Sequence, residues 1–285
     1  MHLNGKLCLS VIVFLLFSSC TTGNNKVGGQ GPKGYDLSHP SVIKLPSDLA
    51  EISGLSYYAK DTSVFAIEDE DGLLFKIFLN QRDKILKWRF DQKHDFEDVA
   101  LHDSLFYILV SNGDIKTVRF TGNDSLVTST SLFPNASKKH NEFETLYYDD
   151  SLKQLIMICK SCEDDSHKAV TAFTVDPVKQ TYTPGPVFIE ASAVAQKLGM
   201  EKIKLKPSAA AINPITKDLY VLCSVNKLLV ITDRMGKFKD VYNLDPSLYK
   251  QPEGLAFAPW GDMIISNEAH DKTALADILV IKYKK

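Results

Sequence analysis

The sequence has almost no excess charge and few cysteines, and both facts exclude broad classes of protein. Its 33 basic and 35 acidic residues give a formal net charge of -2. No basic face is concentrated enough to bind nucleic acid, so no nucleic-acid partner is expected. The chain has 5 cysteines, of which only Cys159, Cys162 and Cys223 lie beyond residue 20. An odd number argues against a full disulfide framework.

Long apolar runs are also missing, and the longest one stands at the start of the chain. Residues 7–17 form an apolar run of 11 residues, which is too short to span a bilayer as a helix. A basic start, this run and small residues before Cys20 are typical of an export signal. We therefore predict a lipoprotein signal peptide over residues 1–20 with Cys20 lipidated; plain secretion and a retained anchor are the alternatives.

The segment after Cys20 is polar and rich in glycine, which predicts a flexible tether over residues 21–38 and a folded domain over residues 39–285. Such a protein would be lipid-anchored in a bacterial cell envelope. Nothing acidic follows Cys20 to direct it to the cell surface. The expected location is therefore the periplasmic side of the outer membrane.

The folded region contains a fivefold repeat. Its segments are EISGLSYY, DFEDVALH, EFETLYYD, KPSAAAIN and QPEGLAFAP. Aligning them on one position gives Ser53, Glu97, Glu144, Ser208 and Glu253, with spacings of 44, 47, 64 and 45 residues. Three spacings match a four-stranded propeller blade of about 40 to 50 residues. The longer one is explained by a helical insertion predicted over residues 190–200, which are rich in helix formers.

Each repeat continues with two β-rich segments and, in most cases, a weaker fourth. The last repeat ends after its third strand, and an unassigned strand over residues 41–46 precedes the first repeat. We therefore predict an all-β fold: a five-bladed β-propeller of four-stranded blades, in which the N-terminal strand closes the last blade. A six-bladed ring with a degenerate blade near residues 165–205 is the alternative.

The repeated position carries acidic residues that are expected at the central channel, because the first strand of each propeller blade lines it. A second polar set, at the ends of the second strands, follows 15 residues later. Converging carboxylates repel one another and raise their pKa values, and a hard cation such as calcium relieves this. The absence of histidine and cysteine at these positions argues against zinc or copper. The predicted metal ligands are Glu97, Glu144, Glu253, Glu68 and Glu268.

A structural role is the alternative for these glutamates, since a repeated side chain can cap turns or bind the backbone of the next blade. Nothing in the sequence resembles a His-Glu-x-x-His zinc motif, a nucleophile elbow or a P-loop.

The repeat segments, together with KPSAAAINPITKDLYVLCSVNKLLVITD and QPEGLAFAPWGDMIISNEA, resemble the SdiA-regulated, YjiK-like propeller family from about residue 40 to the end. The resemblance implies a five-bladed propeller, distantly similar to NHL-repeat propellers, on the outside of a bacterial membrane. It also implies a calcium site, a link of some members to calcium homeostasis, and no established catalytic activity. Of the candidate ligands it supports Glu97, Glu144 and Glu253, while Ser208 replaces a glutamate.

Two functions follow as expectations. The first is a non-enzymatic calcium-binding envelope propeller whose loops bind an unknown envelope protein or small ligand. The second is a metal-dependent hydrolase, lactonase- or phosphoesterase-like, with calcium as the Lewis acid. That reaction needs a base at the channel mouth, for which the candidates are His94, Glu68 and Glu268. A purely structural or adhesive role is a third interpretation.

The CKSC segment brings Cys159 and Cys162 close in sequence. A thioredoxin-type motif needs a strand-to-helix context, and none is predicted here. A local disulfide, two free thiols and a metal-binding pair all remain open. Cys223 is expected in the core.

Overall fold

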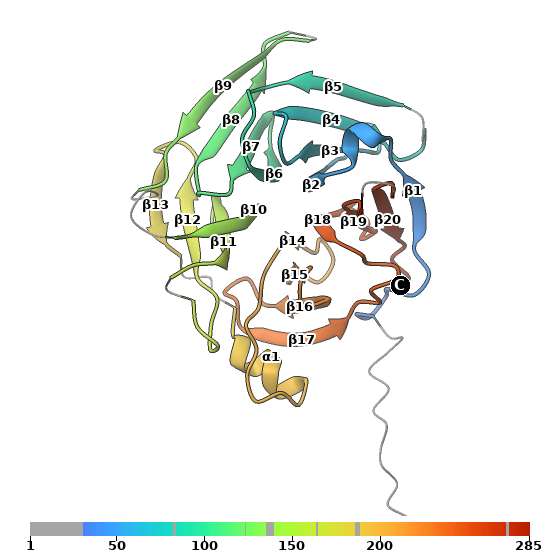
Figure 1. The fold of residues 1–285 in the computed structure, drawn as a ribbon, viewed down its shortest axis with the longest axis vertical. Helices are drawn as coiled ribbons and strands as arrows, with labels where there is room; N and C mark the ends of the chain where they lie inside the picture. Colours follow the sequence, from blue (N-terminus) through green and yellow to red (C-terminus); the bar gives the residue numbers. More distant parts are fainter. Residues whose placement is uncertain are drawn as a thin grey trace, which may run out of the picture.

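The computed structural model describes residues 31–81, 84–122, 124–134, 140–163, 165–185, 189–271 and 274–285. Cys20 and the predicted signal peptide lie outside these residues. The described chain forms five four-stranded antiparallel sheets arranged as a ring, as Figure 1 shows. The five-bladed propeller is thus confirmed and the six-bladed alternative is wrong. No helix of this described part is long and apolar enough to cross a membrane.

Within each blade the strands run outward from the channel in chain order, except at the ring closure. The first blade contains β2 (Ile52–Tyr58), β3 (Ser63–Glu68), β4 (Leu73–Phe78) and β5 (Ile85–Arg89). The second contains β6 (Phe96–His102), β7 (Leu105–Val110), β8 (Ile115–Phe120) and β9 (Leu126–Ser131). The third contains β10 (Glu142–Asp149), β11 (Gln154–Ser161), β12 (Ala172–Asp176) and β13 (Thr181–Pro184). The fourth contains β14 (Ala209–Ile212), β15 (Leu219–Cys223), β16 (Leu228–Thr232) and β17 (Phe238–Asn243).

The fifth blade joins the two ends of the chain. It contains β18 (Pro252–Phe257), β19 (Met263–Asn267), β20 (Asp277–Ile281) and, as its outer strand, β1 (Ser41–Lys44). Strand β1 pairs antiparallel with β20, from Ser41 opposite Val280 to Lys44 opposite Asp277. The predicted closure by the N-terminal strand is therefore confirmed. A 3-10 turn, η1 (Ser47–Leu49), then leads the chain inward to β2.

The described part of the segment before β1, residues 31–40, packs on the ring, which differs from the tether expected at the end of residues 21–38. Residues 21–30 of the predicted tether lie outside the described chain. The side chains of Tyr35 and Leu37 are buried. Tyr35 donates its hydroxyl hydrogen to the carbonyl oxygen of Gly261 at 2.7 Å, and the hydroxyl of Tyr249 donates to the carbonyl oxygen of Leu37 at 2.8 Å. These apolar and aromatic side chains gain more by burial than a polar linker would.

The long spacing in the repeat arises from a helix, as predicted. Helix α1 (Ala191–Lys197) buries Val194 and Ala195 against the outer side of the fourth blade, next to β17 (Figure 1). Gly199 follows with a φ of 69°, a left-handed conformation that glycine adopts without strain and that ends many helices.

The hydrophobic core lies between neighbouring blades rather than in one centre. Every residue of β3, β15 and β19 is buried, whereas the outer strands β5 and β9 are largely exposed or half-buried. This pattern arises because the middle strands have a sheet on both faces, while the outer strands border solvent.

The inner strands approach one another most closely at two glycines of the repeat. A Cβ atom on Gly254 would lie 2.7 Å from the carbonyl oxygen of Ser53 and 2.8 Å from Leu55 Cγ. A Cβ atom on Gly54 would lie 2.5 Å from Asp98 Cα. Only glycine allows these strands to pack at this spacing, which sets the width of the channel.

Gly254→Ala is therefore expected to lower the free energy of unfolding by about 1 to 3 kcal/mol, because the added methyl group overpacks the contact between the fifth and first blades. Urea unfolding followed by circular dichroism measures the change. Gly122→Ala is the control, since nothing lies within 4 Å of a Cβ atom there. Equal stability of the two variants would contradict this account of the inner ring.

Candidate functional site

One mouth of the channel opens into an acidic cavity of about 410 Å³. It lies where the first strands begin and the second strands end. Among the described residues, its acidic lining consists of Asp69, Asp95, Glu97, Glu142, Glu144, Glu253 and Glu268. Two lysines, Lys160 and Lys227, also line it, so acidic groups outnumber basic ones by seven to two. Oxygen atoms of Ser53, Ser224 and Gln251 complete its polar surface.

At each repeat residue that lines the cavity, the pairing of the first strand with the second shifts register. The pairing of β18 with β19 shifts register between Pro252 and Gly254, at Glu253. Similar shifts occur at Glu97 in β6, at Glu144 in β10 and at Ser53 in β2. A β-bulge leaves one residue unpaired and re-aims its side chain. The repeat motif is therefore a bulge motif, and the bulged residues line the cavity.

The fourth blade lacks this arrangement. Ser208 precedes β14 and donates its hydroxyl hydrogen to the carbonyl oxygen of Pro252 at 2.8 Å. It also accepts the backbone N–H of Ser224 at 3.3 Å. Ser208 thus connects two blades, which is the structural role considered as an alternative for the repeat position.

Four of the five predicted ligands lie together at the cavity: Glu97, Glu144, Glu253 and Glu268. Glu68 does not line it. Its carboxylate oxygens accept the backbone N–H groups of Glu70 and Asp71, so it caps the turn after β3. The next residue, Asp69, lines the cavity in its place.

Three lining residues that sequence reasoning missed share one signal. Asp95, Glu142 and Gln251 each stand two positions before a motif glutamate. Side chains two apart in a strand share a face, so this spacing could have revealed them. Asp69, Lys160 and Ser224 share a second signal, because each stands 16 positions after the repeat residue of its blade, which is Ser53, Glu144 or Ser208.

Burial and mutual repulsion raise the pKa values of these carboxyl groups. The pKa of Glu97 is raised to about 9, mainly by burial and then by the charge of Asp95. Burial and the charge of Glu268 raise the pKa of Glu253 to about 7. The pKa of Asp69 is raised to about 8 by burial and by Glu51. Added positive charge in the cavity would therefore favour the ionised form of these carboxyl groups.

Lys160 supplies part of that charge. Its Nζ atom forms ion pairs with Glu144 and with Glu142, the latter at 3.1 Å from Oε1. Its charge also lowers the pKa values of Glu97 and Glu253. Lys227 is arranged differently, because it donates to the carbonyl oxygen of Lys250.

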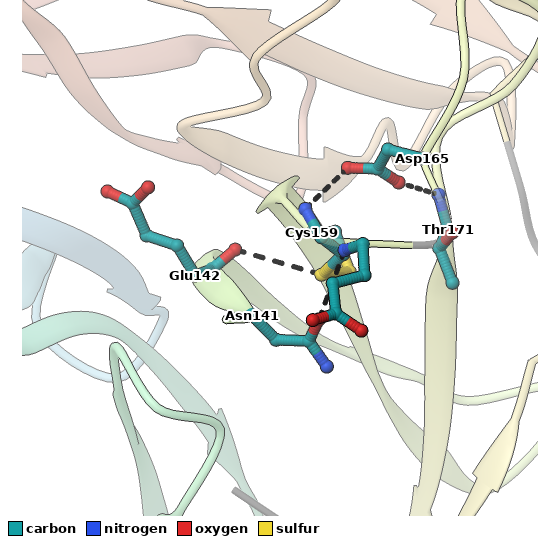
Figure 2. The surroundings of a disulfide bond; sticks show 7 residues. Asn141, Glu142, Cys159, Asp165 and Thr171 are labelled. Carbon is teal, nitrogen blue, oxygen red and sulfur yellow. Dashed lines mark hydrogen bonds between the residues drawn. A yellow bond between two sulfur atoms is a disulfide. The ribbon is translucent and has the colours of Figure 1, made fainter. Parts of the chain in front are cut away.

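A disulfide bond joins Cys159 and Cys162 beside this site. Asp165 fixes the following turn, because its two carboxylate oxygens accept the backbone N–H groups of Cys162 at 2.8 Å and Thr171 at 2.7 Å (Figure 2). Cys223 is a free, buried thiol, and burial raises its pKa to about 12.

The atoms of the cavity that can act as metal ligands are carboxylate, hydroxyl and amide oxygens, which fit calcium better than softer metals. Asp69 Oδ1 is buried and has no hydrogen-bond partner, so it is available to an ion. The carboxylates are nevertheless spread. Among the described residues, Cys159, Cys162 and Asp165 are the sole trio of metal-binding types whose ligand atoms lie within 4.8 Å of one another. Those two sulfur atoms are bonded to each other and so are not thiolate ligands. Calcium would bind at the carboxylates, with water completing about six to eight ligands.

Few of the candidate general bases for a hydrolase lie at this mouth of the channel. His94 is exposed and packs edge-on against Phe96, with ring centroids 5.7 Å apart. No histidine is found among the described residues that line the acidic cavity. Of the three candidate bases, only Glu268 lines it.

Neither protein-family profiles nor curated protein sequences match this chain. Solved structures do. Glutaminyl cyclase from Myxococcus xanthus is 13% identical with a TM-score of 0.56, covering 86% of this chain and 98% of that one. Regucalcin from Agrobacterium tumefaciens, a calcium-binding protein, is 13% identical with a TM-score of 0.52, covering 88% and 95%. The PQQ-bound aldose sugar dehydrogenase from Streptomyces coelicolor is 10% identical with a TM-score of 0.55, covering 89% and 100%.

At these identities the similarity concerns the fold alone. The chain is a β-propeller of a kind shared by enzymes and by a calcium-binding protein.

The cation-free protein is expected to lose stability as the pH rises from about 5 to about 9. In this range folded Glu97, with its pKa raised to about 9 from 4.5, still holds a proton that the unfolded chain has released. Because the folded state then binds more protons, the free energy of unfolding falls with rising pH. Glu97→Gln cannot ionise, so it should lose about 1 to 2 kcal/mol less over this range.

Urea unfolding at pH 5, 7 and 9 in the presence of a chelator measures this difference. Glu201→Gln, an exposed glutamate that is not among the lining residues, is the control and should follow the unmodified protein. Parallel curves for Glu97→Gln and Glu201→Gln would show that Glu97 is not the titrating group.

Proposed function

We propose that this protein is a non-enzymatic, calcium-binding propeller of the SdiA-regulated, YjiK-like family. The acidic cavity would hold the ion, and the rigid ring would present its loops to an envelope protein or a small ligand. The observation that carries this proposal is the gathering of seven carboxylates from four blades around two lysines. An ordinary solvated surface does not raise the pKa values of two glutamates and an aspartate to between about 7 and 9.

The physical role of the ion would be to join the blades. Glu97 belongs to the second blade, Glu144 to the third and Glu253 to the fifth. Left unpaired, these ionised groups repel one another and weaken the ring from its axis. A divalent cation reverses the sign of that interaction, and would thereby stabilise the arrangement of strands across the channel.

The family, its link to calcium homeostasis and the envelope location rest on the sequence. The similarity of the repeat segments supports the family, and the calcium-binding regucalcin shows that the fold is compatible with calcium. The lipid anchor rests on Cys20 and the apolar run before it. The hydrolase alternative has no histidine base in the described lining of the cavity, and we do not favour it.

Calcium is expected to raise the melting temperature of the chelated protein, whereas magnesium and zinc should not match it. At 100 times its dissociation constant, calcium should stabilise the folded state by about 2.7 kcal/mol. For a domain of this size that corresponds to a shift of about 5 to 10 °C. Glu253→Gln should reduce the shift by more than half, because it removes one of the carboxylates that line the cavity.

Differential scanning fluorimetry on residues 31–285 measures the shift, and Glu201→Gln again serves as the control. If calcium leaves the melting temperature unchanged, or if Glu253→Gln and Glu201→Gln respond alike, the cavity is not the calcium site. Calcium-dependent turnover on a panel of lactones and phosphate esters that Glu253→Gln abolishes would favour the hydrolase.

Cys20→Ala is expected to move the full-length protein from the membrane fraction to the soluble fraction, because it removes the predicted site of lipidation. Fractionation of bacteria that express each form, with metabolic labelling by a fatty-acid analogue, measures this. Cys223→Ala is the control and should keep the label. Labelling that survives Cys20→Ala would exclude the predicted anchor.

A further inference from the structure

Lys160 occupies an unusual backbone position. Along β10 and β11, Glu142 pairs with Ser161, Phe143 pairs with Cys159, and Thr145 pairs with Ile158. This register leaves Lys160 unpaired on one strand and Glu144 unpaired on the other. Two consecutive bulges, one on each strand, therefore place the ammonium group and the carboxylate together at the cavity.

The disulfide holds this lysine in place. Lys160 lies inside the short loop that Cys159 and Cys162 close, and both cysteines are buried. The turn after Cys162 is fixed in addition by Asp165, as Figure 2 shows. The backbone of the lysine is thus anchored by a covalent bond, while the four-carbon side chain keeps the rotatable bonds through which the ammonium group can move.

The ammonium group binds the same atoms that a metal ion would use. It contacts Glu142 and Glu144, and its charge also acts on Glu97 and Glu253. An ammonium group donates its three N–H hydrogens in different directions, so its acceptors can lie apart. A calcium ion lies about 2.3 to 2.6 Å from each ligand, so its ligand atoms must converge on one point. The carboxylates have not converged within the described part of the chain.

We infer that Lys160 is an internal competitor for the cation site, and that a divalent ion binds by displacing the Lys160 ammonium group from Glu144 and Glu142. This rests on the proposed function and extends it to selectivity. A monovalent ion gains little by replacing an ammonium group of equal charge that is already held in place. A divalent ion brings twice the charge to the same carboxylates, so Lys160 favours divalent ions and sets the concentration at which they bind.

The first test is calorimetric titration of the metal-free protein with calcium, with the disulfide intact. Lys160→Met, which keeps an unbranched side chain one atom shorter and removes the charge, should bind calcium at least about tenfold more tightly. Lys227→Met removes a cavity charge that acts on Glu253 but forms no ion pair with a carboxylate of the described residues, and it should change the affinity by about twofold to threefold. Lys202→Met, an exposed lysine that does not line the cavity, should have no effect.

The second test uses the unmodified protein and so does not depend on the folding of a variant. Acetylation by an amine-reactive reagent, followed by mass spectrometry, reports the accessibility of each lysine. Saturating calcium should increase the labelling rate of Lys160 several-fold, with Lys202 as the internal reference. Calcium that binds without changing the labelling of Lys160 would overturn the displacement.

The outcomes separate this inference from the proposed function. If the unmodified protein and Lys160→Met bind calcium equally, the competition is refuted while the calcium site stands. Binding by Lys160→Met alone would support the competition and show that Lys160 blocks the site in the resting protein. Absence of binding in both would refute the calcium site, and the inference with it.

Discussion

The pairing of β1 with β20 is the interaction on which the rest of the structure depends. It is a short ladder of four residue pairs, yet it joins the two ends of a chain that otherwise forms an open arc of blades. Once the arc is closed, the first strands of all blades face one axis at a fixed spacing. Glycines at the closest contacts allow that spacing, and the bulged residues of the same strands line the resulting channel mouth.

Closure creates an electrostatic problem at the axis. Carboxylates that would be well solvated on separate sheets are brought into one partly buried cavity, where burial and repulsion both disfavour ionisation. The molecule relieves this in three ways. It protonates some groups, it places Lys160 between Glu142 and Glu144, and, in our proposal, it binds calcium. These are alternative sources of positive charge for one set of oxygen atoms, and this is why they are expected to compete.

Much of the fold could be read from the sequence, because repetition makes each weak strand signal support the others. The five blades, the closing strand and the helical insertion all follow from spacing. The approximate place of the acidic site follows as well, since a residue repeated in every innermost strand must face the axis. The glutamates Glu97, Glu144 and Glu253 were found in this way, and Glu268 through a second repeat.

The residues that were missed depend on local backbone geometry, because spacing alone does not decide which of two adjacent repeat positions faces the cavity. Glu68 and Asp69 are adjacent acids, and only the turn after β3 decides which one caps backbone amides and which one lines the cavity. Lys160 lies in a segment that attracts attention for its cysteines, and its role depends on a register shift between β10 and β11. The segment before β1 has the composition of a linker, but two side chains are enough to dock it.

That docked segment has a mechanical consequence. The strand that closes the ring is also the first strand of the described residues, so tension on the N-terminal side would peel β1 from β20 one hydrogen-bonded pair at a time. Tyr35 and Leu37 are inserted ahead of β1, and their hydrogen-bonded contacts reach Gly261 and Tyr249 in the body of the ring. A pulling force is therefore borne first by two buried side chains. The strand that keeps the propeller closed is loaded only after they have been extracted.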